Sequence, residues 1–525
     1  MNTKPLGAVI GLSILLLAFV PVASAEVLAD SFRLPVTEHT LKNGMRLLIV
    51  ERRDSPTFSA YIRFQVGSVN ESPGQTGLAH LLEHMMFKGT TLFGSTDPAR
   101  EIPILDRIDQ TYLSLQAERQ RATPPGAAAH SERVTVIENE LLALQEEAKS
   151  FVVRNELWEI YRRNGGVGLN ASTSRDGTQY FISLPKNRLE LWALMESDRI
   201  RDPVFREFYT ERSVVQEERR QRVDTSPRGQ LMEIALAIAF MVVPYRHPVL
   251  GWPGDLENLN RPQAQTYFKT HYAPNNALAV LVGDLDPAEV IQVAERYFGT
   301  LPPQPIPPPT FSGEPPQLGE RRVRVEFAAE PQLLMLYQAP PFGHADTASL
   351  TVLSSLLGEG RSSRLYKRLV EETRLATSVS AGPWFLRDAG LLLIQATPRA
   401  PRTSEEVEAA IEEEIARLKS ELVTPWELLK IRNQIDVEAV GYFNSNAGLA
   451  SHLGNAWALS GDWRTLFSDQ EKLKAVSAEE VRNAALRYMI SRRRTVASLV
   501  RGEAPTRGAA TPVRPPATPQ PWELQ

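Results

Sequence analysis

The residues best placed to do chemistry are two histidines, four positions apart, in a chain that has only eight. His80 and His84 belong to the segment GLAHLLEHMMFKGT (77–90). Side chains four residues apart leave the same face of a helix, so both imidazoles can bind one metal ion. Glu83 can then reach a water on that metal without binding the metal itself. The order H-x-x-E-H is typical of one class of zinc hydrolases, and the plainer alternative is two surface histidines beside a salt-bridging glutamate.

A catalytic zinc also needs a third protein ligand and an open position for water. The candidate segment is FYTERSVVQEERRQRVD (208–224). Glu211 and Glu218 are seven residues apart and share one helical face, with two valines between them. A carboxylate on an apolar face is costly unless it is paired or binds a metal. We therefore expect Glu218 to be the third ligand and Glu211 to orient a histidine, whereas Glu217 points elsewhere into solvent.

The composition leaves few other chemistries open. The 525 residues include no cysteine, which excludes disulfides, a thiol nucleophile, an iron–sulfur cluster and a cysteine-bound zinc finger. The formal net charge of −4 gives no sign of a nucleic-acid-binding surface. Any metal site must therefore use His, Asp and Glu.

Alternating strand patterns and amphipathic helical patterns occur in both halves of the chain, and these elements must position the candidate residues. The predicted strands include 46–51, 57–66, 277–283 and 391–396. The predicted helices include 77–87, 187–198, 287–297 and 404–421. The two halves are therefore expected to be globular units that mix strands with helices.

Residues 98–152 follow a different pattern. Apolar residues recur at helical spacing on both sides of a break at ATPPG (122–126), which predicts an antiparallel helical hairpin inserted into the first unit. A partner-binding arm is the alternative to a hairpin that pairs only with itself. A self-contained hairpin would allow residues 110–145 to be replaced by a short Gly/Ser loop. The expected seam residues are Ile104, Ile108, Tyr112, Leu115, Val134, Ile137, Leu141, Leu144, Ala148 and Phe151.

The ends of the chain and its proline clusters define the expected boundaries. Residues 1–25 combine a basic start, an apolar run and an Ala-Ser-Ala ending, which predicts a secretory signal peptide; an uncleaved membrane anchor is the alternative. Residues 301–319 are expected to be a Pro-rich linker and 504–525 a disordered Pro-rich tail. The globular units are then 31–300 and 320–503. An exported chain without a lipidation cysteine is expected in the periplasm.

Three segments resemble a known family. HLLEHMMFKGT, GLNASTSRDGTQY (168–180) and ERSVVQEERR (211–220) occur in the order found in the insulinase/pitrilysin family of zinc metallopeptidases. The likeness is to the short bacterial and mitochondrial-processing-peptidase-like branch, and it covers most of residues 31–500. It implies one Zn²⁺ per chain. The implied roles are His80, His84 and Glu218 as metal ligands, Glu83 as catalytic base, Glu211 as the residue that orients a ligand, and Asn170, Ala171 and Thr173 as the strand that binds substrate.

The resemblance also implies a fold. It implies an α/β (α+β) chain with two similar metallopeptidase-type domains, each an antiparallel-rich sheet with helices on one face, of which the second binds no metal. In the family, two such chains enclose a peptide chamber. The interval between His84 and Glu218 is far longer than is usual for the family, and the inserted hairpin accounts for the excess.

One part of the family pattern is missing. The second domain usually carries an Arg and a Tyr that clamp the substrate, and the matching segment here is EETRLATSVSA (371–381), with Thr373 and Ser380 at those places. We therefore expect this chain to be the catalytic half of a heterodimer with a related, non-catalytic subunit that supplies the clamp. The alternative is a homodimer that anchors its substrate through other residues such as Arg361, Arg364 or Arg374.

Together these features predict a zinc metalloendopeptidase that hydrolyses peptides or unfolded segments inside an enclosed chamber. One alternative is a non-hydrolytic peptide-binding or scaffold subunit, which is disfavoured because all the expected ligands are present. Another is a zinc buffer, which would leave Glu83 without a role.

Overall fold

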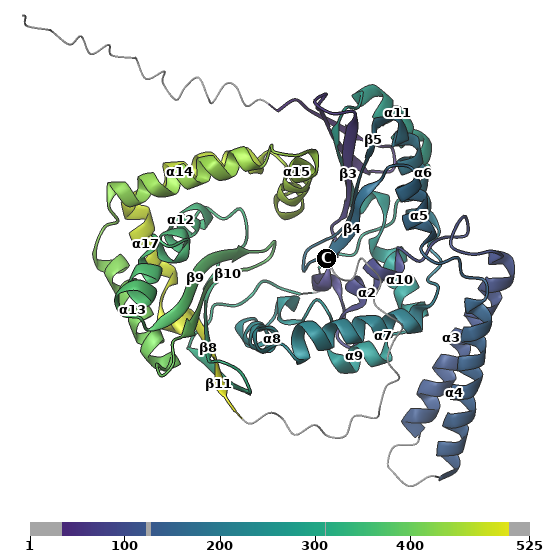
Figure 1. Ribbon diagram of the computed structural model, residues 1–525, viewed down its shortest axis with the longest axis horizontal. Helices are drawn as coiled ribbons and strands as arrows, with labels where there is room; N and C mark the ends of the chain where they lie inside the picture. The colour runs from purple at the N-terminus through teal and green to yellow at the C-terminus, as the bar shows by residue number, and fades with distance from the viewer. Residues whose placement is uncertain (1–33, 122–127, 310, 503–525) are drawn as a thin grey trace, which may run out of the picture.

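A computed structural model describes residues 34–121, 128–309 and 311–502, with side chains omitted for 128–131. The predicted signal peptide and the C-terminal tail lie outside these residues. Two mixed sheets form the framework (Figure 1). The first contains β1 (Val36–Thr40), β2 (Arg46–Glu51), β3 (Thr57–Phe64), β4 (Val167–Thr173), β5 (Thr178–Pro185) and β6 (Ala277–Gly283). The second contains β7 (Arg321–Phe327), β8 (Gln332–Ala339), β9 (Ala376–Phe385), β10 (Gly390–Pro398) and β11 (Arg494–Arg501).

The two sheets share one topology. The strand orders are β1-β2-β6-β3-β5-β4 and β7-β11-β8-β10-β9, so the second repeats the first without its β1 edge strand. In each sheet one pair is parallel, β2 with β6 and β7 with β11, and the remaining pairs are antiparallel. The predicted α/β fold with two similar, antiparallel-rich units is confirmed.

Both units also contain helices. In the first unit they are α2 (Leu78–Met85), α3 (Pro98–Arg121), α4 (Ala128–Lys149), α5 (Glu156–Arg163), α6 (Leu189–Arg201), α7 (Phe208–Arg219), α8 (Pro227–Ala239), α9 (Pro253–Asn258), α10 (Arg261–His271) and α11 (Pro287–Tyr297). In the second they are α12 (Thr347–Gly358), α13 (Ser404–Ser420), α14 (Pro425–Gly441), α15 (Asn446–Ser460), α16 (Thr465–Ala475) and α17 (Ala478–Tyr488). Among the described residues, no helix has the length and apolar character needed to cross a bilayer.

Each sheet is covered on both faces, because each unit contributes one helix to the sheet of the other. Along β2, Leu47 packs into the core formed with the helices of the first unit, whereas Leu48 faces Leu453 and Trp457 of α15. Alternate residues of a strand point to opposite faces, which explains why this strand is apolar throughout. In return, α8 of the first unit packs against β7, β8 and β11 of the second. The sequence analysis expected helices on one face of each sheet, whereas in the structure a helix of the opposite unit also covers the second face.

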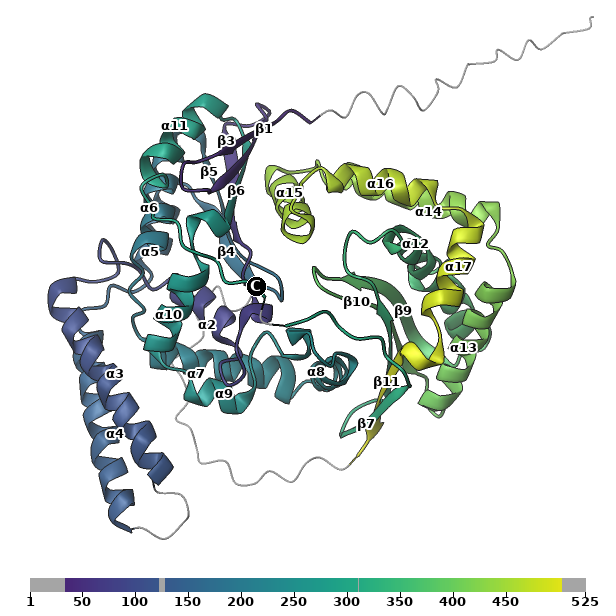
Figure 2. The ribbon, with the colours of Figure 1, turned by 180° about the vertical axis from the view of Figure 1, so that it is seen from behind.

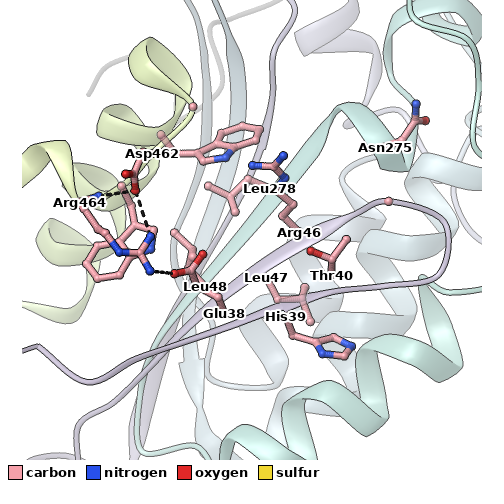
Figure 3. A pocket seen from close by; sticks show the side chains of 14 residues that line it. Glu38, His39, Thr40, Arg46, Leu47, Leu48, Asn275, Leu278, Asp462 and Arg464 are labelled. Carbon is pink, nitrogen blue, oxygen red and sulfur yellow. Dashed lines mark hydrogen bonds and ion pairs between the residues drawn. The ribbon is translucent and has the colours of Figure 1, made fainter. Parts of the chain in front are cut away.

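A cavity of about 570 Å³ lies where the turn after α15 meets β1 and β2 (Figure 3). Arg464 forms ion pairs with Glu38 of β1 and, at 3.2 Å, with Asp462 of its own turn. The guanidinium of Arg46 lies over the ring of Trp457, 5.8 Å from its centre. The two units are therefore joined here by charged and aromatic contacts around the exchanged helix.

The inserted helical hairpin is present as α3 and α4 and extends away from both sheets (Figures 1 and 2). The seam is as predicted: Leu115, Leu141 and Leu144 are buried between the helices. Its base is held by the first unit through a buried ion pair between Glu101 and Arg206, at 2.8 Å. The predicted break at 122–126 lies outside the described residues.

Candidate metal centre

The helix that carries the two histidines has a fixed starting point. Gly77 precedes α2 with φ of +89°, a conformation that favours glycine, and a β-carbon there would lie 2.9 Å from the Cα of Gly251. The buried carboxylate of Glu71 accepts hydrogen bonds from the backbone N–H groups of Gly77 (2.9 Å) and Ala79 (2.8 Å). These contacts satisfy free donors at the helix N-terminus and hold its first turn.

The third candidate ligand comes from another helix. Oε2 of Glu218, next to the end of α7, lies 3.7 Å from Nε2 of His80 and 3.5 Å from Nε2 of His84. One ligand atom from each residue lies within 4.8 Å of those of the other two. Ligand atoms of a tetrahedral zinc with bonds of about 2.0–2.1 Å lie about 3.3–3.4 Å apart. The arrangement of two imidazoles and one carboxylate therefore fits zinc.

The neighbouring glutamate is placed differently. Glu217 lies on the outer side of α7 and pairs with Arg220 at 2.7 Å, where it also accepts a hydrogen bond from Gln221 at 2.9 Å. It makes no ion pair with either histidine in the described part of the chain. The helical phase used to choose between Glu217 and Glu218 therefore agrees with where the two side chains lie.

Glu211 lies where the sequence placed it, behind one histidine. Its Oε1 is 3.0 Å from Nδ1 of His84, an interaction that fixes the ring and leaves Nε2 directed at Glu218. Its other oxygen pairs with Nζ of Lys88 at 2.5 Å, and Lys88 also pairs with Glu207 at 3.6 Å. Sequence reasoning missed Lys88. A lysine inside the apolar segment HMMFKGT was the available signal, because such a residue needs a buried partner.

The pKa values of these groups follow from burial and from their neighbours. Burial lowers the pKa of His80 to about 3, so its imidazole is neutral. Burial also disfavours charge on His84, but hydrogen bonds to Glu211 and Glu218 outweigh it and raise its pKa to about 10. Burial would raise the pKa of Glu211 and of Glu218, yet hydrogen bonds to His84 prevail and lower each to about 2. Both carboxylates are therefore ionised at neutral pH.

Glu83 faces the same region from α2. In the part of the chain that the structure describes, its Oε2 is buried and has no hydrogen-bond partner. Burial raises the pKa of this carboxyl, while a hydrogen bond from the Thr173 hydroxyl opposes the rise. A buried carboxylate with one free oxygen can accept a proton from a group that enters the site. Thr173, expected to bind substrate, thus contacts the expected base.

The other expected substrate residues lie on β4. This strand forms one edge of its sheet, next to α2. Asn170 is exposed and Ala171 is half-buried. An edge strand offers unpaired backbone N–H and C=O groups to an extended chain.

The segment that would hold a substrate clamp carries small neutral residues. Thr373 is half-buried, and Ser380 is exposed on β9. Arg364 forms an ion pair with Glu427 at 2.7 Å, so its guanidinium is already bound within its own unit. Arg361 and Arg374 are exposed.

Known proteins are similar to this chain in sequence and in structure. A family model described as insulinase (peptidase family M16) matches residues 46–103, which include His80, Glu83 and His84. A second, described as the peptidase M16 inactive domain, matches residues 258–435. The zinc protease PqqE of Helicobacter pylori is 29% identical over 84% of this chain and 87% of its own length. The chain belongs to the insulinase family, peptidase family M16.

Further relatives of this M16 chain fall in the same family branch. A probable mitochondrial-processing peptidase subunit beta of Arabidopsis thaliana is 23% identical over 86% of this chain and 75% of its own length. The crystal structure of a protease from Helicobacter pylori superimposes with a TM-score of 0.73 and 26% identity, covering 89% of this chain and 99% of the other. Relatives named zinc proteases support a peptidase function in general. The inactive-domain match does not include any of the candidate metal ligands.

Proposed function

We propose that this chain is a zinc-dependent endopeptidase, with His80, His84 and Glu218 as metal ligands and Glu83 as the general base. The observation that carries the proposal is the convergence of three ligand atoms at zinc spacing beside a buried carboxylate oxygen that has no partner. A surface pair of histidines with a salt-bridging glutamate would not need that buried carboxylate.

The chain's own residues suit peptide hydrolysis. A zinc ion held there would act as a Lewis acid that acidifies water and polarises the peptide carbonyl. Glu83 accepts the proton of the attacking water and passes it to the leaving amine, and the Thr173 hydroxyl keeps its carboxylate oriented. Burial raises the pKa of Glu83, which makes it a better proton acceptor than an exposed glutamate.

The proposed substrates are extended peptides or unfolded protein segments. An extended peptide can add to the free edge of β4 by backbone hydrogen bonds, alongside Asn170 and Ala171. A folded protein cannot present its backbone to this edge in the same way. Strand addition therefore supports a preference for chains without tertiary structure.

We propose that the active form is a heterodimer that encloses a chamber, with a related subunit supplying the Arg and Tyr that this chain lacks. Support comes from the neutral side chains of Thr373 and Ser380 and from the occupied state of Arg364. One relative is itself named as the beta subunit of a processing peptidase. We further propose that the chain is exported, because residues 1–25 have the sequence pattern of a signal peptide.

Substitutions that separate base from ligand test the proposed chemistry. Glu83→Gln should abolish peptide hydrolysis and keep about one zinc per chain, because a base that is not a ligand is lost. His80→Ala, His84→Ala and Glu218→Ala should each lose zinc and activity together. Metal content and turnover of a quenched-fluorescence peptide would be measured, with the related subunit added where the chain alone is inactive.

Glu217→Gln is the matched control, since this neighbour of Glu218 faces Arg220 and should keep both zinc and activity. Hydrolysis by Glu83→Gln at the wild-type rate would contradict the mechanism. Loss of metal from the Glu217 variant but not from Glu218→Ala would contradict the ligand assignment. A zinc-loaded chain without turnover, alone or with its related subunit, would favour a peptide-binding subunit.

A further inference from the structure

Arg222 is a charged neighbour of the metal centre that the proposed chemistry does not use. Its Nη1 pairs with Oε1 of Glu218 at 2.8 Å. The other oxygen of that carboxylate faces His80 and His84. Glu218 thus divides its two oxygens between the metal position and Arg222. The Arg222 side chain is 69% exposed, so its guanidinium reaches solvent directly beside the metal centre.

The backbone under Arg222 is held firmly. The chain leaves α7 in a π-helical turn, Arg220–Asp224, and such turns are frequent at functional sites because they redirect side chains. Gly229 of α8 packs so closely that a β-carbon there would lie 2.2 Å from the Arg222 carbonyl oxygen. Buried Arg219 ties the turn to α8 through Glu233, at 2.7 Å. The backbone is therefore fixed while the guanidinium is exposed, so Arg222 places a positive charge at the surface and does not contribute to the hydrophobic core.

The charge of Arg222 is available for a further partner. Lys88, the other cation at the centre, is held by Glu211 at 2.5 Å. Arg222 is paired only with Glu218 among the residues that the structure describes. Its field reaches the site: burial dominates the pKa values of His80 and Glu83, and the positive charge of Arg222 acts to lower both. A divalent metal would offset the charges of the nearby carboxylates and leave that of Arg222 unmatched.

We propose that Arg222 binds a carboxylate of the substrate peptide next to the scissile bond. A guanidinium has five N–H donors in a planar fork, so one edge can hold Glu218 while another receives a carboxylate through two parallel hydrogen bonds. The carboxylate is an Asp or Glu side chain or the C-terminus of the peptide. The inference rests on the proposed function and adds a preference for negative charge beside the cleaved bond.

Matched peptides test this preference on the zinc-loaded full-length chain, with its related subunit where turnover requires it. One series replaces Glu by Gln at each position flanking the cleaved bond, and a second compares a free C-terminus with its amide. The wild type should favour one carboxylate-bearing peptide by about tenfold or more in kcat/KM. Arg222→Gln should abolish that ratio, and Arg222→Lys should reduce it, since an ammonium lacks the planar fork.

Arg220→Gln is the control, because Arg220 lies on the same turn and pairs with Glu217, away from the histidines. It should leave the ratio unchanged. Binding of the same peptides to zinc-loaded Glu83→Gln, followed by fluorescence anisotropy, measures the preference without hydrolysis. The double variant with Arg222→Gln should lose it, and the double variant with Arg220→Gln should keep it.

The outcomes separate this inference from the proposed function. A carboxylate preference in binding, without turnover by any form of the protein, would support Arg222 and contradict the endopeptidase. Equal peptide ratios in the wild type and Arg222→Gln would overturn the role of Arg222 and leave the endopeptidase intact. A third outcome is that Arg222→Gln loses zinc and the preference together, and that saturating zinc restores the preference. This outcome would also overturn the role of Arg222, because the residue would then act only by holding Glu218.

Discussion

At the scale of single residues, the metal centre holds one proton that zinc must displace. His80 is neutral because burial lowers its pKa to about 3, and Glu211 and Glu218 are ionised. His84 is the exception, because hydrogen bonds to the two glutamates overcome burial and raise its pKa to about 10. An imidazole binds a metal only in its neutral form. The proton of His84 must therefore leave when zinc enters.

Zinc binding by the metal-free chain should accordingly release about one proton at pH 8. Affinity should rise about tenfold per pH unit up to about pH 10, since His84 stays protonated below its raised pKa. Titration calorimetry in buffers of different ionisation enthalpy measures the proton count. Glu211→Gln should reduce it, because a charge that raises the pKa of His84 is removed, whereas Glu217→Gln should leave it unchanged. Identical counts in these two variants would contradict the assignment of the proton to His84.

At the scale of elements, the hairpin is divided into a base and a tip. At the base, Asp109 of α3 accepts hydrogen bonds from Arg261 at 2.9 Å and Tyr209 at 3.0 Å. Tyr112 packs on Tyr209 and is hydrogen-bonded by Arg212, and both of these partners belong to α7. Replacing residues 110–145 would therefore also remove Tyr112 and its contacts with α7, the helix that carries Glu218.

A shorter cut should be tolerated. Replacing residues 118–139 by a four-residue Gly/Ser loop keeps the base, and loop closure costs little free energy, so the chain should fold and bind about one zinc. Thermal unfolding and metal analysis measure both properties. Glu101→Ala is the contrasting change at the base: it leaves the fully buried Arg206 without its carboxylate partner, with only backbone carbonyls to accept its hydrogen bonds, and should lower the free energy of unfolding by about 3–5 kcal/mol. If the shortened chain folds but binds no zinc, the tip of the hairpin contributes to the metal site.

At the scale of the whole molecule, the two units are tied together at several places. The exchanged helices α8 and α15 each complete the core of the opposite sheet. A further contact joins the turn between β4 and β5 to the turn between β9 and β10, where Tyr245 donates to Asp176 at 2.6 Å and lies 3.3 Å from Asp388. The edge strand β4 is therefore held in position relative to the second unit.

The missing clamp leads to a prediction for the assembled protein. The isolated chain should be fully loaded with zinc and yet weakly active or inactive, because positioning of the substrate contributes several orders of magnitude to rate. Adding the related subunit that carries Arg and Tyr should restore turnover. Size-exclusion chromatography and peptide hydrolysis measure the two properties together. A zinc-loaded homodimer with robust turnover and no second subunit would contradict the heterodimer.

The sequence by itself determined the features that depend on local periodicity. A two-residue period marked β3, predicted over 57–66 and formed over Thr57–Phe64, and a helical period placed His80 beside His84 and separated Glu218 from Glu217. These features require only the geometry of one element. The tertiary structure decided what depends on contacts between distant elements. It brought α7 to α2, gave Lys88 its partner and exchanged α8 with α15. Each of these contacts joins an apolar face or a charge to a complementary group far away in the chain. Local periodicity carries no information about where that group lies.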